Sequence, residues 1–351
     1  MEHICKVSVK ASKDYDILIG EGLLDAAGEQ VRRVLGTCRP AVLTDDTVDA
    51  LYGGRVLRSL ATAGLDACKF VFPHGESSKN LGVMASFLDF MAEHRLTRGD
   101  AVIALGGGVP GDMGGFAAAV FLRGVPCVQI PTTLLAAVDS SVGGKTAVDI
   151  PAGKNLAGAF HQPSLVLCDT KTLDTLPPDI LRDGFAEVVK YGVILDEDLF
   201  SAVSVPPVQD MQAVIRRCVE LKRDVVGADE FDRGTRQLLN FGHTVGHAIE
   251  QLSGFTVSHG SAVAKGMHRA ARMGAAMGLG DFTAPIRDTL LRYGFDLSCP
   301  YTAEELFDVM LNDKKRLPDT ITLVLPERIG RCGLYKMPVS RALELLKATA
   351  S

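Results

Sequence analysis

AVIALGGGVPGDMGGF, residues 101–116, joins an apolar run to a glycine-rich turn and the start of a helical pattern. The continuous apolar residues of 101–105 predict a strand that is buried on both faces, as in a parallel sheet. Gly106, Gly108 and Gly111 follow in a G-x-G-x-x-G pattern, which lets backbone amides approach a phosphate at a helix N-terminus. This stretch therefore predicts a nucleotide-binding α/β domain, and a glycine turn that serves only tight packing is the alternative.

The rest of the predicted nucleotide site is less regular. The acidic residue that usually binds the ribose about 20 residues further on is missing, because 126–131 reads PCVQIP. Polar groups at two other predicted strand ends are candidates to replace it, TDD at 44–46 and HGESSK at 74–79.

The pattern of apolar residues changes near residue 175. Before it, short apolar runs alternate with amphipathic stretches such as 79–95, which is typical of a parallel sheet covered by helices. The strands are expected at 15–20, 40–45, 68–72, 101–105, 127–131 and 165–169. After LPPD at 176–179, long helical patterns cover 180–195, 208–227, 235–252, 260–278 and 303–313, and 320–330 reads as a strand or hairpin. We therefore expect an α/β domain over 1–175 and a mainly helical domain over 176–351.

The composition is that of a globular enzyme. The 351 residues are 47% hydrophobic and carry a net charge of -5, which argues against a broad nucleic-acid or anionic-membrane surface. No signal peptide is evident, and the most apolar stretch, 116–138, contains Arg123 and Gln129 and would span a membrane poorly. The eight cysteines form no C-x-x-C pair, so reduced thiols and a cytoplasmic location are expected.

A stripe of polar residues runs along the predicted helix 235–252. Arg236, Asn240, His243 and His247 fall at i, i+4, i+7 and i+11, on one face of an otherwise apolar helix. A hydrogen-bonded network in the core is one interpretation, and a metal site is the other. The glutamate that a zinc hydrolase carries after its first histidine is absent from NFGHTVGH, residues 240–247.

Metal sites that perform chemistry commonly use three protein ligands, imidazoles or carboxylates, and leave a position open. Spacing alone pairs His243 with His247. Further candidates are His259 and Glu187, and His74 and His161 stay open because they lie in predicted loops.

Several longer strings resemble the 3-dehydroquinate synthase family in their order along the chain. They are GGGVPGDMGGFAAAVFLRG, QIPTTLLAAVDSSVGGKTAVDIPAGKNLAGAFHQP, GFAEVVKYGVI, LLNFGHTVGHAIE, SHGSAVAKGM and NDKK. The resemblance implies a homodimer whose subunits have a Rossmann-like NAD-binding domain and a helical metal-binding domain. It also implies that zinc, or cobalt, is bound by Glu187, His243 and His259, with His247 facing the substrate, so that the pairing from spacing is half wrong.

The resemblance implies a reaction in which NAD is used and regenerated. NAD oxidises the hydroxyl at carbon 5 of 3-deoxy-D-arabino-heptulosonate 7-phosphate, phosphate is eliminated, the hydride returns, and the opened ring closes by aldol addition to 3-dehydroquinate. The metal polarises the oxygens at carbons 4 and 5 as a Lewis acid. Lysine and arginine side chains hold the carboxylate and phosphate of the substrate.

The family pattern assigns roles to individual residues. To NAD it assigns Asp45, Gly75, Glu76, Ser77, Ser78, Lys79, Gly107, Gly108, Val109, Pro110, Gly111, Asp112, Thr132, Thr133, Lys145, Lys154, Thr172, Leu173, Asp174 and Thr175. To the substrate it assigns Asp139, Lys154, Asn155, Lys190, Lys222, Arg236, Asn240, His247 and one of Lys314 and Lys315. Arg123 is expected to reach the phosphate site of the neighbouring subunit.

Two related activities are the alternatives. A metal-dependent polyol dehydrogenase, resembling glycerol dehydrogenase, would release NADH, and other sugar phosphate cyclases would take different sugar phosphates. The GKN of residues 153–155, together with DSSVGGKT, favours the dehydroquinate branch.

Overall fold

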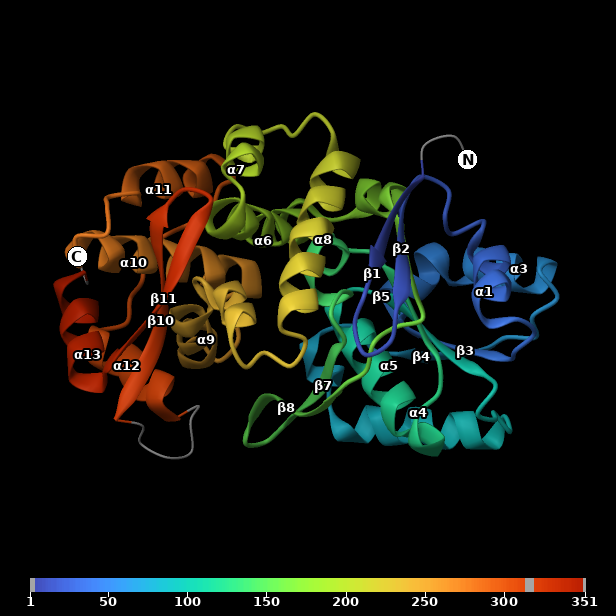
Figure 1. Ribbon diagram of the computed structural model, residues 1–351. Coiled ribbons are helices and arrows are strands. Elements are labelled where there is room, and N and C mark those ends of the chain that lie inside the picture. Colours follow the sequence, from blue (N-terminus) through green and yellow to red (C-terminus); the bar gives the residue numbers. More distant parts are fainter. Residues whose placement is uncertain (1–3, 313–318, 350–351) are drawn as a thin grey trace. The chain divides into compact units, whose positions relative to one another are not determined.

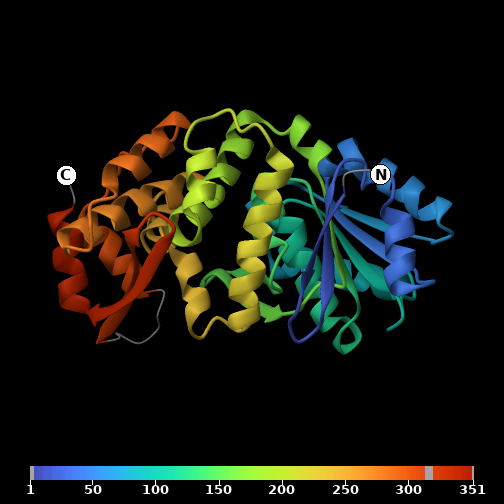
Figure 2. The ribbon, with the colours of Figure 1, turned by 45° about the horizontal axis from the view of Figure 1, so that its top comes forward.

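The computed structural model describes residues 4–312 and 319–349. The chain forms two compact units, which we call the first and second units (Figures 1 and 2). The first comprises Met1–Pro177 and Met211–Phe231, and the second comprises Pro178–Asp210 and Asp232–Ser351. The sequence prediction placed the helix of 208–227 in the second domain. The structure differs here, because α8 (Met211–Ala228) packs against β1, β2 and the η4 segment and belongs to the first unit.

A seven-stranded sheet forms the centre of the first unit, in the order β1-β2-β9-β6-β5-β3-β4. All neighbouring strands are parallel except β1 and β2. The strands are β1 (Cys5–Val9), β2 (Tyr15–Gly20), β3 (Pro40–Asp45), β4 (Cys68–Phe72), β5 (Ala101–Gly106), β6 (Cys127–Pro131) and β9 (Leu165–Asp169). Every residue of β3, β5, β6 and β9 is buried, so the predicted parallel sheet and its six strands are confirmed.

Side chains from alternate positions of β5 enter two different cores. Ile103 and Leu105 pack in a cluster with residues of α1 (Ala27–Leu35) and α3 (Gly54–Thr62). Val102 packs in the other cluster with residues of α4 (Leu81–Glu93) and α5 (Gly108–Val120). Because successive side chains of a strand point to opposite faces, helices cover both faces of this sheet.

Shorter elements complete the first unit. A hairpin of β7 (Lys145–Ile150) and β8 (Gly153–Phe160) is antiparallel. The short helices are α2 (Asp46–Val48), η1 (Asp49–Gly53), η2 (Glu76–Ser78), η3 (Phe121–Arg123), η4 (Ala136–Ser140) and η5 (Thr170–Thr175).

The second unit is mainly helical, with one antiparallel hairpin. Its elements are α6 (Pro178–Leu195), α7 (Glu197–Val203), η6 (Thr235–Asn240), α9 (His243–Leu252), α10 (His259–Ala276), α11 (Thr283–Arg292), α12 (Ala303–Asn312), β10 (Thr320–Arg328), β11 (Arg331–Pro338) and α13 (Val339–Ala348). The backbones of α9 and α10 lie very close together. A Cβ on Gly266 of α10 would lie only 1.9 Å from the carbonyl oxygen of Gly242, the residue before α9. Only glycine fits there, and the two helices are held closely together.

The single helix predicted over 235–252 is wrong. The 3-10 helix η6 ends at Asn240, Gly242 adopts a left-handed φ of +80°, and α9 begins at His243. A side chain at Gly242 would also meet Met267, with its Cβ 2.6 Å from Cγ. Arg236 and Asn240 therefore lie in η6, whereas His243 and His247 lie in α9, so the four residues do not share one continuous helix.

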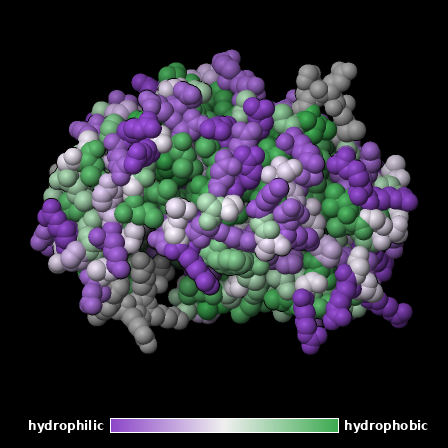
Figure 3. Space-filling view, viewed as in Figure 1, coloured by the Kyte–Doolittle hydropathy of each residue, from purple (hydrophilic) through white to green (hydrophobic). Residues whose placement is uncertain are grey.

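Hydrophilic residues, in purple, and hydrophobic residues, in green, are mixed on the face that Figure 3 shows. No helix within 4–312 and 319–349 has the length and apolar character that crossing a membrane requires. All eight cysteines are free thiols in this structure.

Candidate active site

Three side chains from three helices of the second unit converge on one point. Glu187 lies in α6, and His243 and His259 are the first residues of α9 and α10. The Nε2 atoms of His243 and His259 lie 3.4 and 3.3 Å from the same oxygen, Oε1 of Glu187. Ligands at about 2.0–2.1 Å from a tetrahedral zinc ion are separated from one another by roughly 3.3 Å. The described residues thus present a carboxylate and two imidazoles at the spacing that a divalent metal needs.

Lys190 forms a buried ion pair with Glu187. Both side chains are only 1% exposed, and Lys190 Nζ contacts Oε2, the oxygen that the two imidazoles do not share. Burial by itself would raise the pKa of Glu187, but Lys190 and then His243 and His259 outweigh it and hold this pKa well below its usual value. Glu187 is therefore ionised and available as a ligand.

Glu250 is a further member of this cluster that the sequence analysis missed. It is 4% exposed, and its Oε2 lies 3.5 Å from Nδ1 of His259, on the side of the ring away from Glu187. Burial would lower the pKa of His259, but the two carboxylates, Glu187 and Glu250, raise it to about 10. The cluster is therefore built to hold positive charge at this position. In the sequence, Glu250 is marked only as the glutamate that ends HTVGHAIE, seven residues after His243.

The other polar residues predicted near the metal lie on α9 and η6. His247 is exposed, and its ring centroid lies 5.4 Å from that of His243 and 6.2 Å from that of His259. The ligand atoms of His247 group with those of Glu250 and His259 rather than with those of His243. Arg236 is 1% exposed in η6, and Asn240 is half-buried at the end of the same segment.

In the first unit, the predicted NAD residues follow the carboxyl ends of neighbouring parallel strands. Asp45 ends β3, Gly107 follows β5, Thr132 follows β6, and the η5 segment follows β9. Ligands of open α/β sheets bind at this edge. Gly106 has a φ of +149°, and a Cβ there would lie 2.6 Å from Cγ of Pro110, so the turn requires glycine.

Lys79 connects three predicted segments of this unit. It is 5% exposed, and its Nζ donates to Asp112 Oδ2 and to Asn155 Oδ1, each at 2.6 Å. Burial would lower the pKa of Lys79, but Asp112 and Glu76 raise it. Lys154 lies 3.4 Å from Glu76, so residues 76–79, 112 and 154–155 come together.

Two further contacts join predicted residues of the first unit. Lys222 of α8 donates to the carbonyl oxygen of Asp139 at 2.8 Å and pairs with its carboxylate. The Tyr52 hydroxyl donates to the carbonyl oxygen of Thr172 at 3.2 Å and hydrogen-bonds Thr175, which fixes the η5 segment.

The other predicted residues lie elsewhere on the chain. Lys145 and Arg123 are exposed, and Lys314 and Lys315 lie outside the described residues. The structure places the remaining predicted residues as follows: Gly75 before η2, Ser77 and Ser78 within η2, Gly108, Val109, Pro110 and Gly111 in the first turn of α5, Thr133 after β6, and Leu173 and Asp174 in η5.

Family models match most of the chain. The 3-dehydroquinate synthase N-terminal model matches residues 69–183, and the 3-dehydroquinate synthase C-terminal model matches residues 184–316. The chain belongs to the 3-dehydroquinate synthase family. The resemblance and the fold class predicted from sequence are confirmed.

Curated relatives extend this likeness over nearly the whole chain. The 3-dehydroquinate synthase of Caulobacter vibrioides is 45% identical over 340 residues, 92% of this chain and 92% of that protein. The 3-dehydroquinate synthase of Enterococcus faecalis is 41% identical over 333 residues, covering 92% of this chain and 93% of that protein.

Solved structures of related cyclases share the fold. A 2-deoxy-scyllo-inosose synthase complexed with carbaglucose-6-phosphate, NAD+ and Co2+ is 25% identical with a TM-score of 0.88, covering 98% of this chain and 100% of that one. A 2-epi-5-epi-valiolone synthase from Streptomyces hygroscopicus with NAD+ and Zn2+ bound is 26% identical with a TM-score of 0.87, covering 99% of each. A glycerol dehydrogenase from Schizosaccharomyces pombe is 16% identical with a TM-score of 0.63, covering 94% of this chain and 87% of that one. At this identity the likeness shows only a common fold.

Glu250→Gln is expected to weaken zinc or cobalt binding by roughly 10–100-fold, the usual cost of losing a carboxylate that orients a metal-bound histidine. The neutral amide still fills the space, but its oxygen accepts a weaker hydrogen bond from an Nδ1–H on His259 than a carboxylate does. Competition with a chromogenic chelator measures the affinity. Glu344→Gln, at an exposed surface pair, is the control and should bind metal like the unaltered protein. Equal affinities in all three proteins would contradict this role for Glu250.

Proposed function

We propose that this protein is a 3-dehydroquinate synthase that converts 3-deoxy-D-arabino-heptulosonate 7-phosphate to 3-dehydroquinate and phosphate, in the shikimate pathway. The observation that carries the proposal is the 45% identity to a protein of that name over 92% of both chains. The buried cluster of Glu187, His243 and His259 supports it, because a chain that only bound a nucleotide would have no use for these ligands.

We propose NAD as the cofactor and zinc or cobalt as the metal, as in the two related cyclases with NAD+ and Zn2+ or Co2+. When bound, NAD accepts a hydride from the substrate and gives it back within the same turnover. When bound, a divalent metal lowers the cost of alkoxide formation as a Lewis acid. Glu187, His243 and His259 would hold the metal, and the start of α5 would receive the pyrophosphate at its positive end.

The charges of the chain's own residues fit a doubly anionic substrate. Lys190, Lys222 and Arg236 are all buried cations in a chain whose net charge is -5. We propose that they, with Lys154, Asn155, Asn240 and His247, bind the carboxylate, phosphate and hydroxyls of the substrate, since charge-assisted hydrogen bonds to oxyanions are strong. Asp139 would hold Lys222 in place through the contact described above.

One assay separates this function from a polyol dehydrogenase. The purified protein is given the heptulosonate phosphate and less NAD than substrate, and phosphate release is followed together with near-ultraviolet absorbance. Many turnovers per NAD with no accumulation of NADH are expected, because the hydride leaves and returns. NADH formed in proportion to product would support the dehydrogenase, and no phosphate release would reject the synthase.

The proposal includes a homodimer in the cytoplasm, where free thiols stay reduced. Arg123 supports the dimer, because it is exposed at a left-handed turn, with a φ of +67°, and could reach a neighbouring subunit. Two parallel hydrogen bonds from a guanidinium can grip a phosphate.

Arg123→Ala is expected to weaken substrate binding by roughly 1.5–3 kcal/mol, the range for a hydrogen bond to a charged group. NAD and metal binding should not change. Mixing this variant with a His243→Ala chain should restore one working site in some mixed dimers, and turnover of the mixture measures it. If verified subunit exchange restores no turnover, Arg123 does not act across a dimer.

A further inference from the structure

The tip of the β7–β8 hairpin carries Lys154 and Asn155, two residues proposed to bind the substrate. The register of the two strands shifts between Val148 and Ile150, and Asn155 has a left-handed φ of +55°. Most of residues 151–156 are exposed, so packing does little to fix the tip. A left-handed residue that has a side chain costs free energy and persists only where its surroundings hold it. Hydrogen bonds must therefore position these two residues.

Asn155, Asp149 and Lys79 form a closed ring of three hydrogen bonds, which we call the Asp149 ring. The Asn155 N–H donates to Asp149 Oδ1 at 2.8 Å, and the Asp149 N–H donates to the carbonyl oxygen of Lys79 at 2.8 Å. The ammonium group of Lys79 donates to Asn155 Oδ1 at 2.6 Å and closes the ring. Asn155 is thus held at its backbone by Asp149 and at its side chain by Lys79.

Asp149 connects residues proposed for NAD with residues proposed for the substrate. Lys79 follows η2 and also donates to Asp112 at 2.6 Å, whereas Lys154 belongs to the hairpin tip and lies 3.4 Å from Glu76. Burial chiefly raises the pKa of Asp149, and the charges of Lys79 and Lys154 act against this rise. The Asp149 carboxylate is therefore attracted to a lysine of each group.

We propose that Asp149 is a positioning residue for the reaction, which holds Asn155 and, through the same turn, Lys154 where they bind the substrate. The inference rests on the proposed function, because the role of the hairpin tip in substrate binding comes from there. Groups that are already held in place lose less conformational freedom when a ligand binds, so the Asp149 ring increases the affinity for the substrate. Opening the ring should weaken binding without removing a group that touches the substrate.

Two variants of Asp149 test this role in the enzyme with metal and NAD bound. Asp149→Ala opens the ring, and Asp149→Asn keeps an oxygen that accepts from the Asn155 N–H. In the alanine variant, the KM for the heptulosonate phosphate should rise roughly tenfold, the factor for weakening a hydrogen bond to a charged group. The asparagine variant should recover most of this loss. A smaller folded fraction lowers the apparent kcat but leaves KM unchanged, so KM separates positioning from a general effect on stability.

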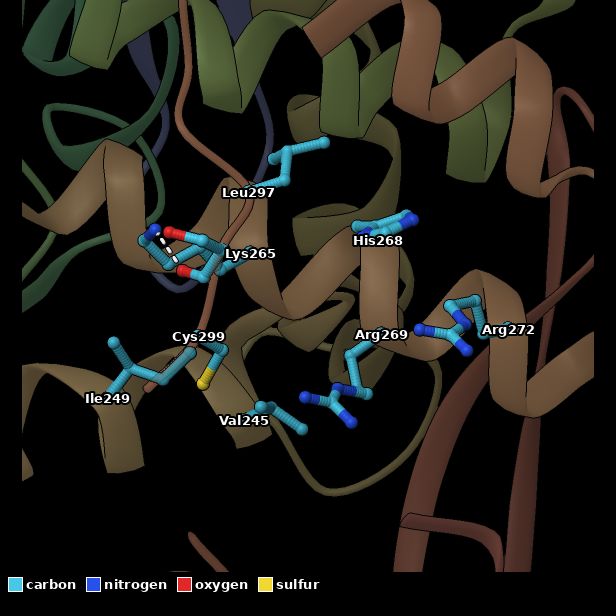
Figure 4. A pocket seen from close by; sticks show the side chains of 9 residues that line it. Val245, Ile249, Lys265, His268, Arg269, Arg272, Leu297 and Cys299 are labelled. Carbon is cyan, nitrogen blue, oxygen red and sulfur yellow. Dashed lines mark hydrogen bonds between the residues drawn. The ribbon is translucent and has the colours of Figure 1, made fainter. Parts of the chain in front are cut away.

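Asp296→Ala, in the second unit, is the matched control. Asp296 Oδ1 accepts from the Ser298 N–H at 2.9 Å, and its Oδ2 pairs with Lys265 at 3.2 Å, so this variant also removes a carboxylate that contacts a backbone N–H and a lysine. Lys265, Leu297 and Ser298 line a cavity of about 160 Å³, in which Figure 4 shows the first two labelled. The control should leave the KM unchanged.

Hydrogen exchange of the peptide that contains Asn155 gives a second measure, which needs no turnover. The peptide should lose protection in Asp149→Ala and keep it in Asp149→Asn and Asp296→Ala, because only the first variant lacks the acceptor for the Asn155 N–H. Unchanged exchange in Asp149→Ala, or an unchanged KM in a variant that turns over, would overturn the positioning role. If the unaltered protein releases no phosphate, the proposed function fails, and exchange still decides whether Asp149 holds the turn.

Discussion

Replacement of His243 by alanine is expected to reduce turnover by at least about 100-fold, because losing a residue that merely orients a metal ligand already costs roughly 10–100-fold. The variant keeps only Glu187 and His259 of the cluster. Metal content after dialysis and the rate of phosphate release measure the effect. In the unaltered protein, a chelator should abolish turnover, and zinc or cobalt should restore it; in the variant, added metal should not.

A control histidine tests whether this effect is specific. His94, in the first unit, packs on Phe90 and has no place in the cluster, so His94→Ala should keep its metal and its turnover. Full turnover of a metal-free sample of the unaltered protein would show that the cluster has no catalytic metal.

The central strands could be predicted from sequence because burial on both faces leaves a continuous apolar run. β3, β5, β6 and β9 have this pattern, and each forms where it was expected. The edge strand β1, CKVSV, was missed because it alternates buried and exposed residues and pairs with only one neighbour. Its short alternation is a weak signal, since loops also mix polar and apolar residues.

Two errors came from contacts between elements that are distant in the sequence. Periodicity continues through Gly242, so nothing local showed that α10 packs on this residue and leaves no room for a side chain. Likewise, the pattern of α8 is helical, but only its packing against β1 and β2 assigns it to the first unit. Local patterns predict the elements, whereas close approach between them is a tertiary property.

The cluster around Glu187 could be predicted only in part for the same reason. Spacing within one segment paired His243 with His247. His259 and Glu187 come from other helices, so they were candidates from sequence, but only the family resemblance joined them to His243. Glu250 was missed because its role depends on the orientation of the His259 ring, which no spacing encodes.

Lys190→Met is expected to destabilise the metal-free protein by about 3–5 kcal/mol, the cost of breaking a buried ion pair by removing one partner. Methionine nearly matches the length of lysine but leaves the Glu187 carboxylate in the protein interior, where both side chains are 1% exposed, without its cation. Denaturant unfolding monitored on the second unit measures the change. Part of the lost stability should return when zinc is added, since the metal supplies positive charge to the same carboxylate and stabilises the state that binds it.

Lys347→Met provides the contrast to this prediction, because Lys347 pairs with Glu304 at 2.7 Å on the surface, with both side chains at least half exposed. Solvent screens such pairs, so little change in the free energy of unfolding is expected there, with or without zinc. The two variants remove the same charged group and differ mainly in burial. If both change the free energy of unfolding equally, or if zinc stabilises Lys190→Met no more than Lys347→Met, the charge of Glu187 is balanced by some group other than Lys190 and the metal.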